Sequence, residues 1–181
     1  ISLIIVPRYP TDVEQIENYL KSKDLYAVRK SELDKTKCFV MSQQDILIVD
    51  TIGELRTLYS IANIAFVGGS LFYRGKKKGG HNIIEPAVLG VPVLFGPYNF
   101  SFQDTVRELL AAEAGIQVSD QKQLNKALDE LLINEHKRQR MGQRARDVIL
   151  KNNGVTDRNY SLLAPLLKKM RIRPDPAQFK I

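Results

Sequence analysis

Residues 79–87 combine two glycines with polar side chains at the expected start of a helix. The run reads Gly-Gly-His-Asn-Ile-Ile-Glu-Pro-Ala, with His81 and Asn82 in the first turn and Glu85 one turn later. Backbone amides at a helix start attract anions, and the two carboxylate oxygens of Glu85 suit the paired hydroxyls of a ribose. Taken alone, Glu85 also fits the helix dipole and His81 fits a structural imidazole, so these structural roles stay open.

Two more polar loops follow apolar runs. Residues 66–70 read Phe-Val-Gly-Gly-Ser, in which residues without a Cβ let backbone amides approach a phosphate and Ser70 adds a hydroxyl. The loop at residues 96–104 adds the amide side chains of Asn99 and Gln103 beside aromatic rings. Each pattern is common by itself, so neither loop identifies a ligand.

The first third of the chain holds two further candidate loops. In Val6–Pro10, two prolines fix the loop around Arg8, whose guanidinium can bind a phosphate or carboxylate with two hydrogen bonds. Residues 50–55 read Asp-Thr-Ile-Gly-Glu-Leu and lead into a helix whose first amides suit an anion or a carbonyl. A surface arginine and Thr51 as an N-cap explain the same residues without a ligand.

The sequence lacks a complete catalytic set. It contains no Ser/His/Asp arrangement, no P-loop, no full dinucleotide fingerprint and no metal-ligand spacing. Cys38 is the single cysteine, and His81 and His136 lie far apart in the chain. We therefore expect neither a catalytic residue nor a metal site here, but a surface that holds a nucleotide.

Short apolar runs alternate with helical patterns, which is typical of an α/β fold with a parallel sheet. The expected strands are residues 3–6, 25–29, 46–49, 64–67, 93–95 and 116–118. The expected helices are residues 12–21 capped by Thr11, 53–61, 83–89, 102–114 ending at Gly115, a helix opened by Asp120, 136–151 and 155–170. We predict one Rossmann-like, doubly wound domain over residues 1–170, with a tail at 171–181. Ligands bind such sheets at the carboxyl ends of the strands, where all the candidate loops fall.

The net charge of +7 on the 181 residues is unevenly distributed. Residues 121–181 contain 14 Lys and Arg against 6 Asp and Glu, a net charge of +8, whereas residues 1–120 have a net charge of −1. A basic last third favours an anionic partner such as a membrane, a nucleic acid or a phosphorylated substrate. A solvated helix face that binds nothing is an equal alternative.

Together these segments resemble the bacterial Kdo transferases, which are GT-B glycosyltransferases that move 3-deoxy-D-manno-octulosonic acid (Kdo) from CMP-Kdo to a lipid A precursor. The resemblance rests on VPRYP (6–10), DTIGEL (50–55), AFVGGSL (65–71), GGHNIIEPAVLGVPVLFGP (79–97) and NFSFQD (99–104). It implies the C-terminal half of a GT-B fold. The family's acceptor domain, catalytic base and membrane-anchoring segment belong to an N-terminal half, so we expect this chain to bind CMP-Kdo without catalysing transfer alone. In three places the chain departs from the family pattern: an expanded segment at 72–78, Ile83 where proline is usual and Tyr98 where histidine is usual.

The resemblance also implies site residues. The expected CMP contacts are Pro7, Arg8, Ile52, Gly53, Glu54, Asn82, Ile83, Ile84 and Glu85; weaker donor-site candidates are Gly69, Ser70, His81, Asn99 and Gln103. In our interpretation the Ile52–Glu54 backbone reads the cytosine edge, Glu85 binds the ribose hydroxyls, and Ser70 and Arg8 face the phosphate with the amides near Asn82. No cofactor or metal is expected besides the CMP-Kdo substrate.

The expected partners are CMP-Kdo, the lipid A precursor, the missing N-terminal domain and an anionic membrane surface, with no nucleic acid. The whole protein is expected at the cytoplasmic face of the bacterial inner membrane, and this fragment in solution. Two alternatives remain. One is the donor domain of another GT-B enzyme or half of a UDP-sugar epimerase, and the other is a basic module that binds polyanions or membranes.

Overall fold

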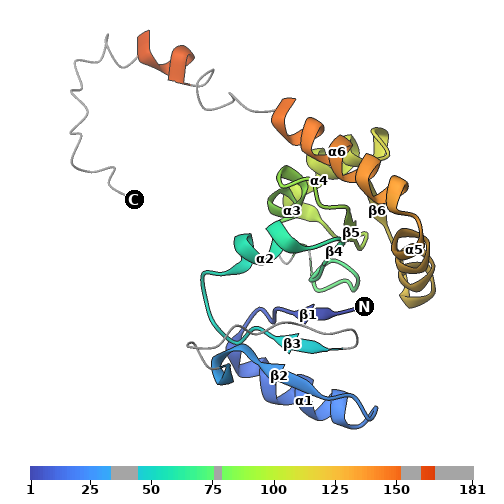
Figure 1. Ribbon diagram of the computed structural model, residues 1–181. Coiled ribbons are helices and arrows are strands. Elements are labelled where there is room, and N and C mark those ends of the chain that lie inside the picture. The colour runs from blue at the N-terminus through green and yellow to red at the C-terminus, as the bar shows by residue number, and fades with distance from the viewer. Residues whose placement is uncertain (34–44, 76–78, 152–159, 166–181) are drawn as a thin grey trace. The chain divides into compact units, whose positions relative to one another are not determined.

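The computed structural model describes residues 1–33, 45–75, 79–151 and 160–165, and Figure 1 shows its helices and strands. The chain divides into two compact units, Ile1–Ile61 and Ala62–Ile181, each described by itself below. The single domain over residues 1–170 stays a prediction. The expected tail at 171–181 and Cys38 lie outside the described residues.

The first unit is a three-stranded parallel sheet with a helix packed against it. Its strand order is β1-β3-β2, with Leu3 and Ala27 both in register with Ile46. An ion pair between Arg29 and Glu17 ties β2 to α1. The elements are β1 (Leu3–Ile5), η1 (Pro10–Asp12), α1 (Val13–Lys21), β2 (Ala27–Arg29), η2 (Lys30–Glu32), β3 (Ile46–Ile48) and α2 (Leu55–Ile61).

The second unit is another parallel three-stranded sheet, in the order β4-β5-β6. Ala65 pairs with Val93 and Val93 with Gly115, so the three strands begin at one edge and end at the other. The elements are β4 (Ala65–Val67), α3 (Ile84–Val88), β5 (Val93–Phe95), η3 (Phe100–Phe102), α4 (Gln103–Ala111), β6 (Gly115–Gln117), α5 (Gln121–Ile133) and α6 (Glu135–Lys151).

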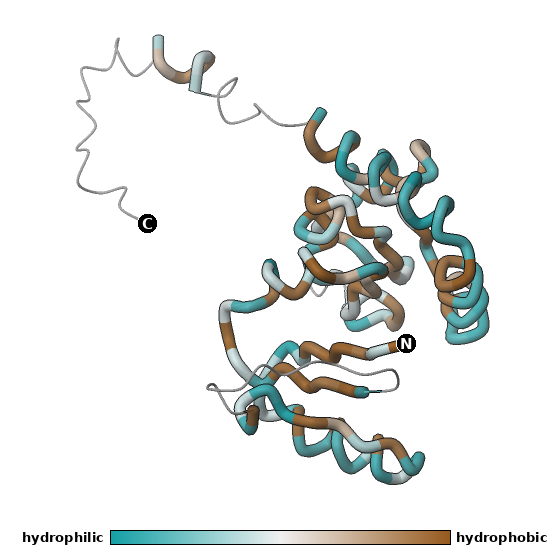
Figure 2. Tube along the Cα trace, in the orientation of Figure 1, coloured by the Kyte–Doolittle hydropathy of each residue, from teal (hydrophilic) through white to brown (hydrophobic). Residues whose placement is uncertain are grey.

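The central strand of the second unit is buried on both faces. Val93 and Phe95 belong to one hydrophobic cluster with residues of α3, α4 and α6, whereas Leu94 belongs to another with Leu131 of α5. A strand covered on both sides has no need of alternating polar residues, which explains the uninterrupted apolar run. Figure 2 shows hydrophobic strands and helices with hydrophilic stretches.

The expected α/β class, six strands and parallel pairing are confirmed, but two helix ends are corrected. Thr11 lies in η1, and Asp12 is the N-cap of α1 without a side-chain cap bond. The helix before β6 ends at Ala111, and Glu113, not Gly115, takes the positive φ of 51°. A Cβ on Gly115 would lie 2.9 Å from the Phe95 ring, so close packing explains that glycine. Asp120 caps α5 as expected, accepting a hydrogen bond from the Gln123 amide.

Most of the expected last helix, 155–170, lies outside the described residues. The part that the structure describes, residues 160–165, is helical. Within the described part of the chain, no helix is long and apolar enough to span a membrane.

Two glycines allow α6 to approach the turn that follows α3. A Cβ on Gly142 would lie 1.9 Å from the Gly90 carbonyl oxygen, far inside van der Waals contact, and Gly90 has a φ of 78°. The neighbouring α6 residue Met141 is buried. The α6 helix therefore packs closely against the turn after α3. The facing atom is a backbone carbonyl oxygen, which cannot move aside as a flexible side chain could.

We predict that Gly142→Ala lowers the free energy of unfolding by about 1–3 kcal/mol, because the new methyl group overpacks this contact. Helix propensity alone would raise the free energy of unfolding by about 1 kcal/mol. The sign of the measured change therefore shows which of the two effects is larger. Chemical denaturation measures the difference. Gln143→Ala, at an exposed neighbouring position, is the control and should stay within about 0.5 kcal/mol of the parent. A Gly142→Ala protein at least as stable as the parent would contradict the close contact.

Candidate functional site

In the second unit, parallel pairing brings three polar loops to one edge of the sheet. Val67 pairs with Phe95, so the loops that follow β4 and β5 leave the sheet at neighbouring carboxyl ends. The third segment, residues 79–85, joins them through the His81 amide, which donates to the Gly68 carbonyl at 3.2 Å, and the Gly80 amide, which donates to the Tyr98 carbonyl at 2.9 Å. Carboxyl ends of parallel strands are where such folds bind ligands.

Ser70 connects two of these loops from inside. Its hydroxyl donates to the Val67 carbonyl at 3.0 Å and accepts from the Gly96 amide at 2.8 Å, and the side chain is fully buried. The Tyr98 amide also donates to the Ser70 carbonyl at 2.9 Å. The expected role of Ser70 in facing a phosphate is corrected, because its hydroxyl is buried and already bonded on both sides. Ser70 instead positions the loops.

Glycines allow the loop backbones to approach one another. A Cβ on Gly96 would lie 2.2 Å from the Ser70 carbonyl oxygen, and one on Gly80 would lie 2.0 Å from Asn99 Oδ1. Gly69 has a φ of 75°, and a Cβ there would lie 2.6 Å from an Arg74 nitrogen. Gly69, Gly80 and Gly96 therefore have a packing role in this structure, whereas a Cβ on Gly68 would meet no atom within 4 Å.

Asn82 and Glu85 form a hydrogen-bonded pair at the start of α3. Asn82 Oδ1 accepts from the Ile84 amide at 2.9 Å, and its Nδ2 donates to Glu85 Oε1 at 2.9 Å. Both residues are half-buried. Asn82 thus orients one carboxylate oxygen of Glu85, and the rigid carboxylate can accept hydrogen bonds from paired hydroxyls. The Ile84 amide, however, is already used by Asn82.

The remaining candidates of this unit differ in exposure. The Ile83 side chain is fully buried in the core, so a nucleotide contact at this position would involve only its backbone. Asn99 is 3% exposed and donates to the Gly96 carbonyl at 2.5 Å, so its side chain is buried within the loop that it was expected to supply to the donor site. His81 is half-buried, and Gln103 is exposed at the start of α4.

An aromatic group and one arginine hold the segment after Ser70 to the other loops. Tyr73 lies edge-on to Tyr98 at 5.5 Å between ring centroids and to Phe100 at 6.2 Å. Arg74 donates to the carbonyls of Gly69, at 2.7 Å, and Gly79, at 3.3 Å. The described part of the expanded segment 72–78 therefore packs against the site loops; residues 76–78 lie outside the described residues.

In the first unit the carboxyl ends of β2 and β3 carry a network of charged side chains. Glu54 accepts hydrogen bonds from Lys30 Nζ at 2.8 Å and from Thr51 Oγ1 at 2.6 Å. Asp50 accepts from the amide of Ser31 at 2.9 Å and from its hydroxyl. The hydrogen bond from Lys30, followed by that from Thr51, lowers the pKa of Glu54. The pKa of Asp50 is lowered mainly by the Ser31 hydroxyl.

The other candidates of the first unit are accessible. Ile52 is 88% exposed, and Gly53 adopts a φ of 94° in open space. Arg8 is exposed, with its guanidinium 5.9 Å from the Tyr9 ring centroid, and Pro7 is half-buried. The structure thus brings Ile52, Gly53 and Glu54 together in one turn.

The sequence interpretation missed Lys30 and Ser31, whose signal is their position directly after the β2 strand. It also missed a cavity of about 530 Å³ in the second unit and one of about 330 Å³ in the first. Neither is lined by an expected nucleotide contact. Within the described residues, no group of three His, Cys, Asp or Glu side chains could hold a metal ion. The candidate site is therefore identified by the arrangement of its loops.

Comparison with known families and proteins supports the resemblance drawn from the motifs. The family described as "Glycosyl transferases group 1" matches residues 29–148. A 3-deoxy-D-manno-octulosonic acid transferase of Haemophilus influenzae is 33% identical over 92% of this chain and 38% of its own length. The corresponding protein of Bordetella pertussis is 32% identical over 89% of this chain and 36% of its own length. The chain thus spans less than two fifths of these relatives.

Two further similarities concern a solved structure and a bifunctional protein. The crystal structure of the C-terminal CMP-Kdo binding domain of WaaA from Acinetobacter baumannii is 31% identical, with a TM-score of 0.69 over 81% of this chain and 72% of that one. A bifunctional glycosyltransferase/methyltransferase of Fusobacterium nucleatum is 39% identical over 70% of this chain and 19% of its own length. The first of these confirms the expected fold class, that of the C-terminal half of a GT-B enzyme.

We predict that the Lys30–Glu54 contact stabilises the protein at neutral pH and not in acid. Because the folded pKa of Glu54 lies below its ordinary value of 4.5, the stabilisation is complete above that value and disappears as the pH falls through the lowered pKa. Glu54→Gln should therefore lower the Tm at pH 7, and the difference from the parent should shrink progressively as the pH falls below 4.5. Thermal unfolding followed by circular dichroism measures both. A difference that does not change with pH would contradict the ionic contribution.

Proposed function

Because the chain belongs to the glycosyl transferases group 1 family, we propose that it is the donor-nucleotide-binding domain of a Kdo transferase. In this proposal the whole protein moves Kdo from CMP-Kdo to a lipid A precursor during lipopolysaccharide synthesis, at the cytoplasmic face of the inner membrane. The observation that carries the proposal is the similarity in sequence and fold to a C-terminal CMP-Kdo binding domain. Donor binding is assigned to this chain and the transfer step to the whole protein.

Glu85 is the proposed ribose ligand. Asn82 holds Glu85 Oε1 at 2.9 Å, so the carboxylate is oriented before a ligand arrives. A carboxylate accepts two hydroxyl hydrogen bonds without rearranging, which is the pattern that the 2′- and 3′-hydroxyls of a ribonucleotide present. Preorganisation of this kind reduces the entropy that binding would otherwise cost.

The loop backbones supply the second part of the proposed site. The hydrogen bonds of the Gly80 and His81 amides give the 79–85 segment one fixed position beside the ends of β4 and β5, which Ser70 joins. Pro7, Arg8, Ile52, Gly53 and Glu54 remain proposed CMP contacts on the first unit. The Ile52–Glu54 turn exposes an apolar side chain and a positive-φ glycine, which suits close approach of a flat base to the backbone.

In an inverting transfer, the donor side stabilises the departing CMP phosphate while a base deprotonates the acceptor hydroxyl. Arg8 is the proposed cation for the phosphate, since its exposed guanidinium forms no ion pair with the described residues. The base is proposed to belong to the acceptor domain of the whole protein. No metal or cofactor is proposed to take part.

We predict that Glu85→Gln weakens CMP binding by at least about fivefold, because one charge-assisted hydrogen bond to the ribose is replaced by a neutral one. Isothermal titration calorimetry of the 181-residue chain measures the change. Asp129→Asn removes a carboxylate from an exposed position on α5 and is the matched control, with an expected affinity equal to the parent's. Equal CMP affinity of Glu85→Gln and the parent would exclude the ribose role.

The same titration with UDP tests the other glycosyltransferase reading. A donor domain for CMP-Kdo should bind CMP at least about tenfold more tightly than UDP, whereas a UDP-sugar enzyme should show the reverse order. If the chain prefers UDP, the Kdo transferase proposal is wrong and another activity of the glycosyl transferases group 1 family takes its place. The assignment to the family would still hold.

A further inference from the structure

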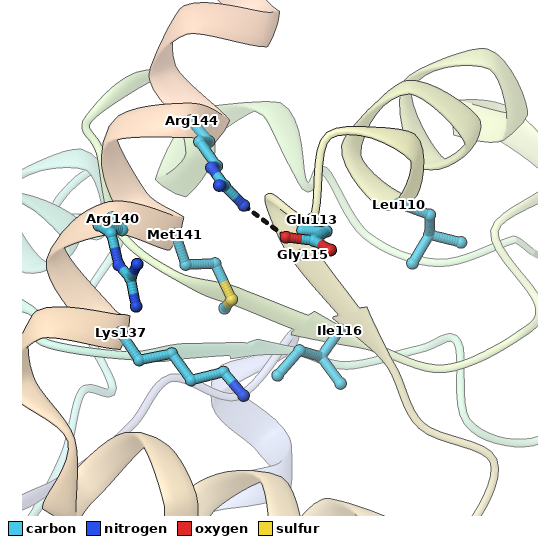
Figure 3. Close-up of a pocket in the computed structure, with 8 residues that line it drawn as sticks. All are labelled: Leu110, Glu113, Gly115, Ile116, Lys137, Arg140, Met141 and Arg144. Carbon is cyan, nitrogen blue, oxygen red and sulfur yellow. Dashed lines mark hydrogen bonds and ion pairs between the residues drawn. The ribbon is translucent and has the colours of Figure 1, made fainter.

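A cavity of about 530 Å³ lies between α6 and the segment that joins α4 to β6 (Figure 3). Three of its lining side chains are cations from one helix: Lys137, Arg140 and Arg144. Spacings of three and four residues put these side chains on one face of α6. Figure 3 shows Arg144 reaching Glu113, and Lys137 extending towards Ile116.

This cavity lies at the opposite edge of the sheet from the donor loops. Glu113 and Gly115 line the cavity, and Gly115 is the first residue of β6, in register with Val93, the first residue of β5. The candidate donor loops instead follow the last residues of β4 and β5. A ligand in the cavity would therefore occupy a second site of the same unit, which the proposed function does not use.

The cavity has an excess of positive charge. Its charged lining consists of the three cations and Glu113, a net charge of +2. Arg144 pairs with Glu113 at 2.6 Å, and Lys137 pairs with Glu130 of α5. Arg140 is exposed and forms no ion pair or hydrogen bond with the residues that the structure describes. The Arg140 guanidinium is thus available to bind an anion. Its neighbours on α6, Lys137 and Arg144, each form an ion pair with one carboxylate.

The rest of the lining is apolar. Leu110 is 40% exposed, and Ile116 and Met141 complete this side of the cavity. A small inorganic anion would leave this surface uncovered, whereas a ligand with both a phosphate and an apolar part would cover both regions. A phosphate monoester carries a charge of about −1.5 to −2 at neutral pH, which matches the lining charge. The forked geometry of arginine favours phosphate over a point charge.

We propose that this cavity binds a phosphate-bearing ligand, with Arg140 as the principal contact, Lys137 and Arg144 beside it, and the apolar part of the ligand against Leu110 and Ile116. The phosphate can come from a soluble ester or from a lipid headgroup, and the two sources share this chemistry. Glu113 competes with the ligand for Arg144, so it sets the affinity of the site.

The test uses the 181-residue chain and two probes. Inorganic pyrophosphate, titrated by calorimetry in a buffer of low ionic strength, represents a soluble phosphate. Phosphatidylcholine vesicles with and without about 30 mol % phosphatidylglycerol, followed by co-sedimentation, represent a lipid headgroup. Binding of pyrophosphate identifies a soluble ester as the source, and binding only to the anionic vesicles identifies a lipid.

Arg140→Ala should weaken binding of the active probe by at least about fivefold. Arg146→Ala is the matched control, because Arg146 is exposed on the far side of α6 and does not line the cavity; it should change the affinity by less than about twofold. Glu113→Gln should strengthen binding by at least about twofold, since it releases Arg144. This gain cannot come from a misfolded variant.

Two results would overturn the proposal. In the first, neither probe binds. In the second, Arg140→Ala and Arg146→Ala weaken binding equally, which indicates attraction to the overall charge of α6. A gain for Glu113→Gln together with a selective loss for Arg140→Ala supports a localised site.

Discussion

The hydroxyl of Ser70 is the contact on which the arrangement of the second unit's loops depends. It donates to Val67 at the end of β4 and accepts from Gly96 at the end of β5, so one buried oxygen joins the two strand ends. With both hydrogen bonds made, this buried polar group is satisfied, whereas an unpaired one would be costly. Gly96 must be a glycine beside it, because the Ser70 carbonyl occupies the space of a Cβ.

The position of Glu85 follows from this contact. The segment that carries it is attached to both loops by the His81 and Gly80 amides. Asn82 then fixes the carboxylate itself. A chain of short-range contacts therefore leads from the sheet to one charged side chain. The buried Ser70 hydroxyl and the backbone hydrogen bonds hold the loops in place, and Glu85 is the side chain proposed to bind the ribose.

Most of the fold could be predicted from the sequence, because its strands are short apolar runs and its helices have clear periodicity. The helix opened by Asp120 is an example, since an aspartate N-cap acts locally. The sequence predicts the wrong end for the helix before β6 because Gly115 matches a C-cap pattern, whereas the constraint on this glycine is the Phe95 ring, distant in sequence. Patterns report local geometry and cannot report such packing.

The same limit applies to the site. Glu85 and Asn82 could be found from their place in a glycine-bounded helix start. The sequence suggests Ser70 and Asn99 as ligand contacts because their side chains are polar, yet both are buried and hold the loops. The cavity beside α6 was missed, since the basic residues there suggested a diffuse charge; only the structure brings Glu113 and Ile116 next to Arg140 and its neighbours on α6.

The central claim is that this chain binds CMP through the loops at the carboxyl ends of its strands. An amide NMR titration of the 181-residue chain with CMP tests it most directly. The account predicts saturable shift changes concentrated at residues 69–70, 80–85 and 96–99, together with 7–8 and 52–54, and little change on α5. Absence of saturable changes in these loops, or changes confined to other surfaces, would contradict it.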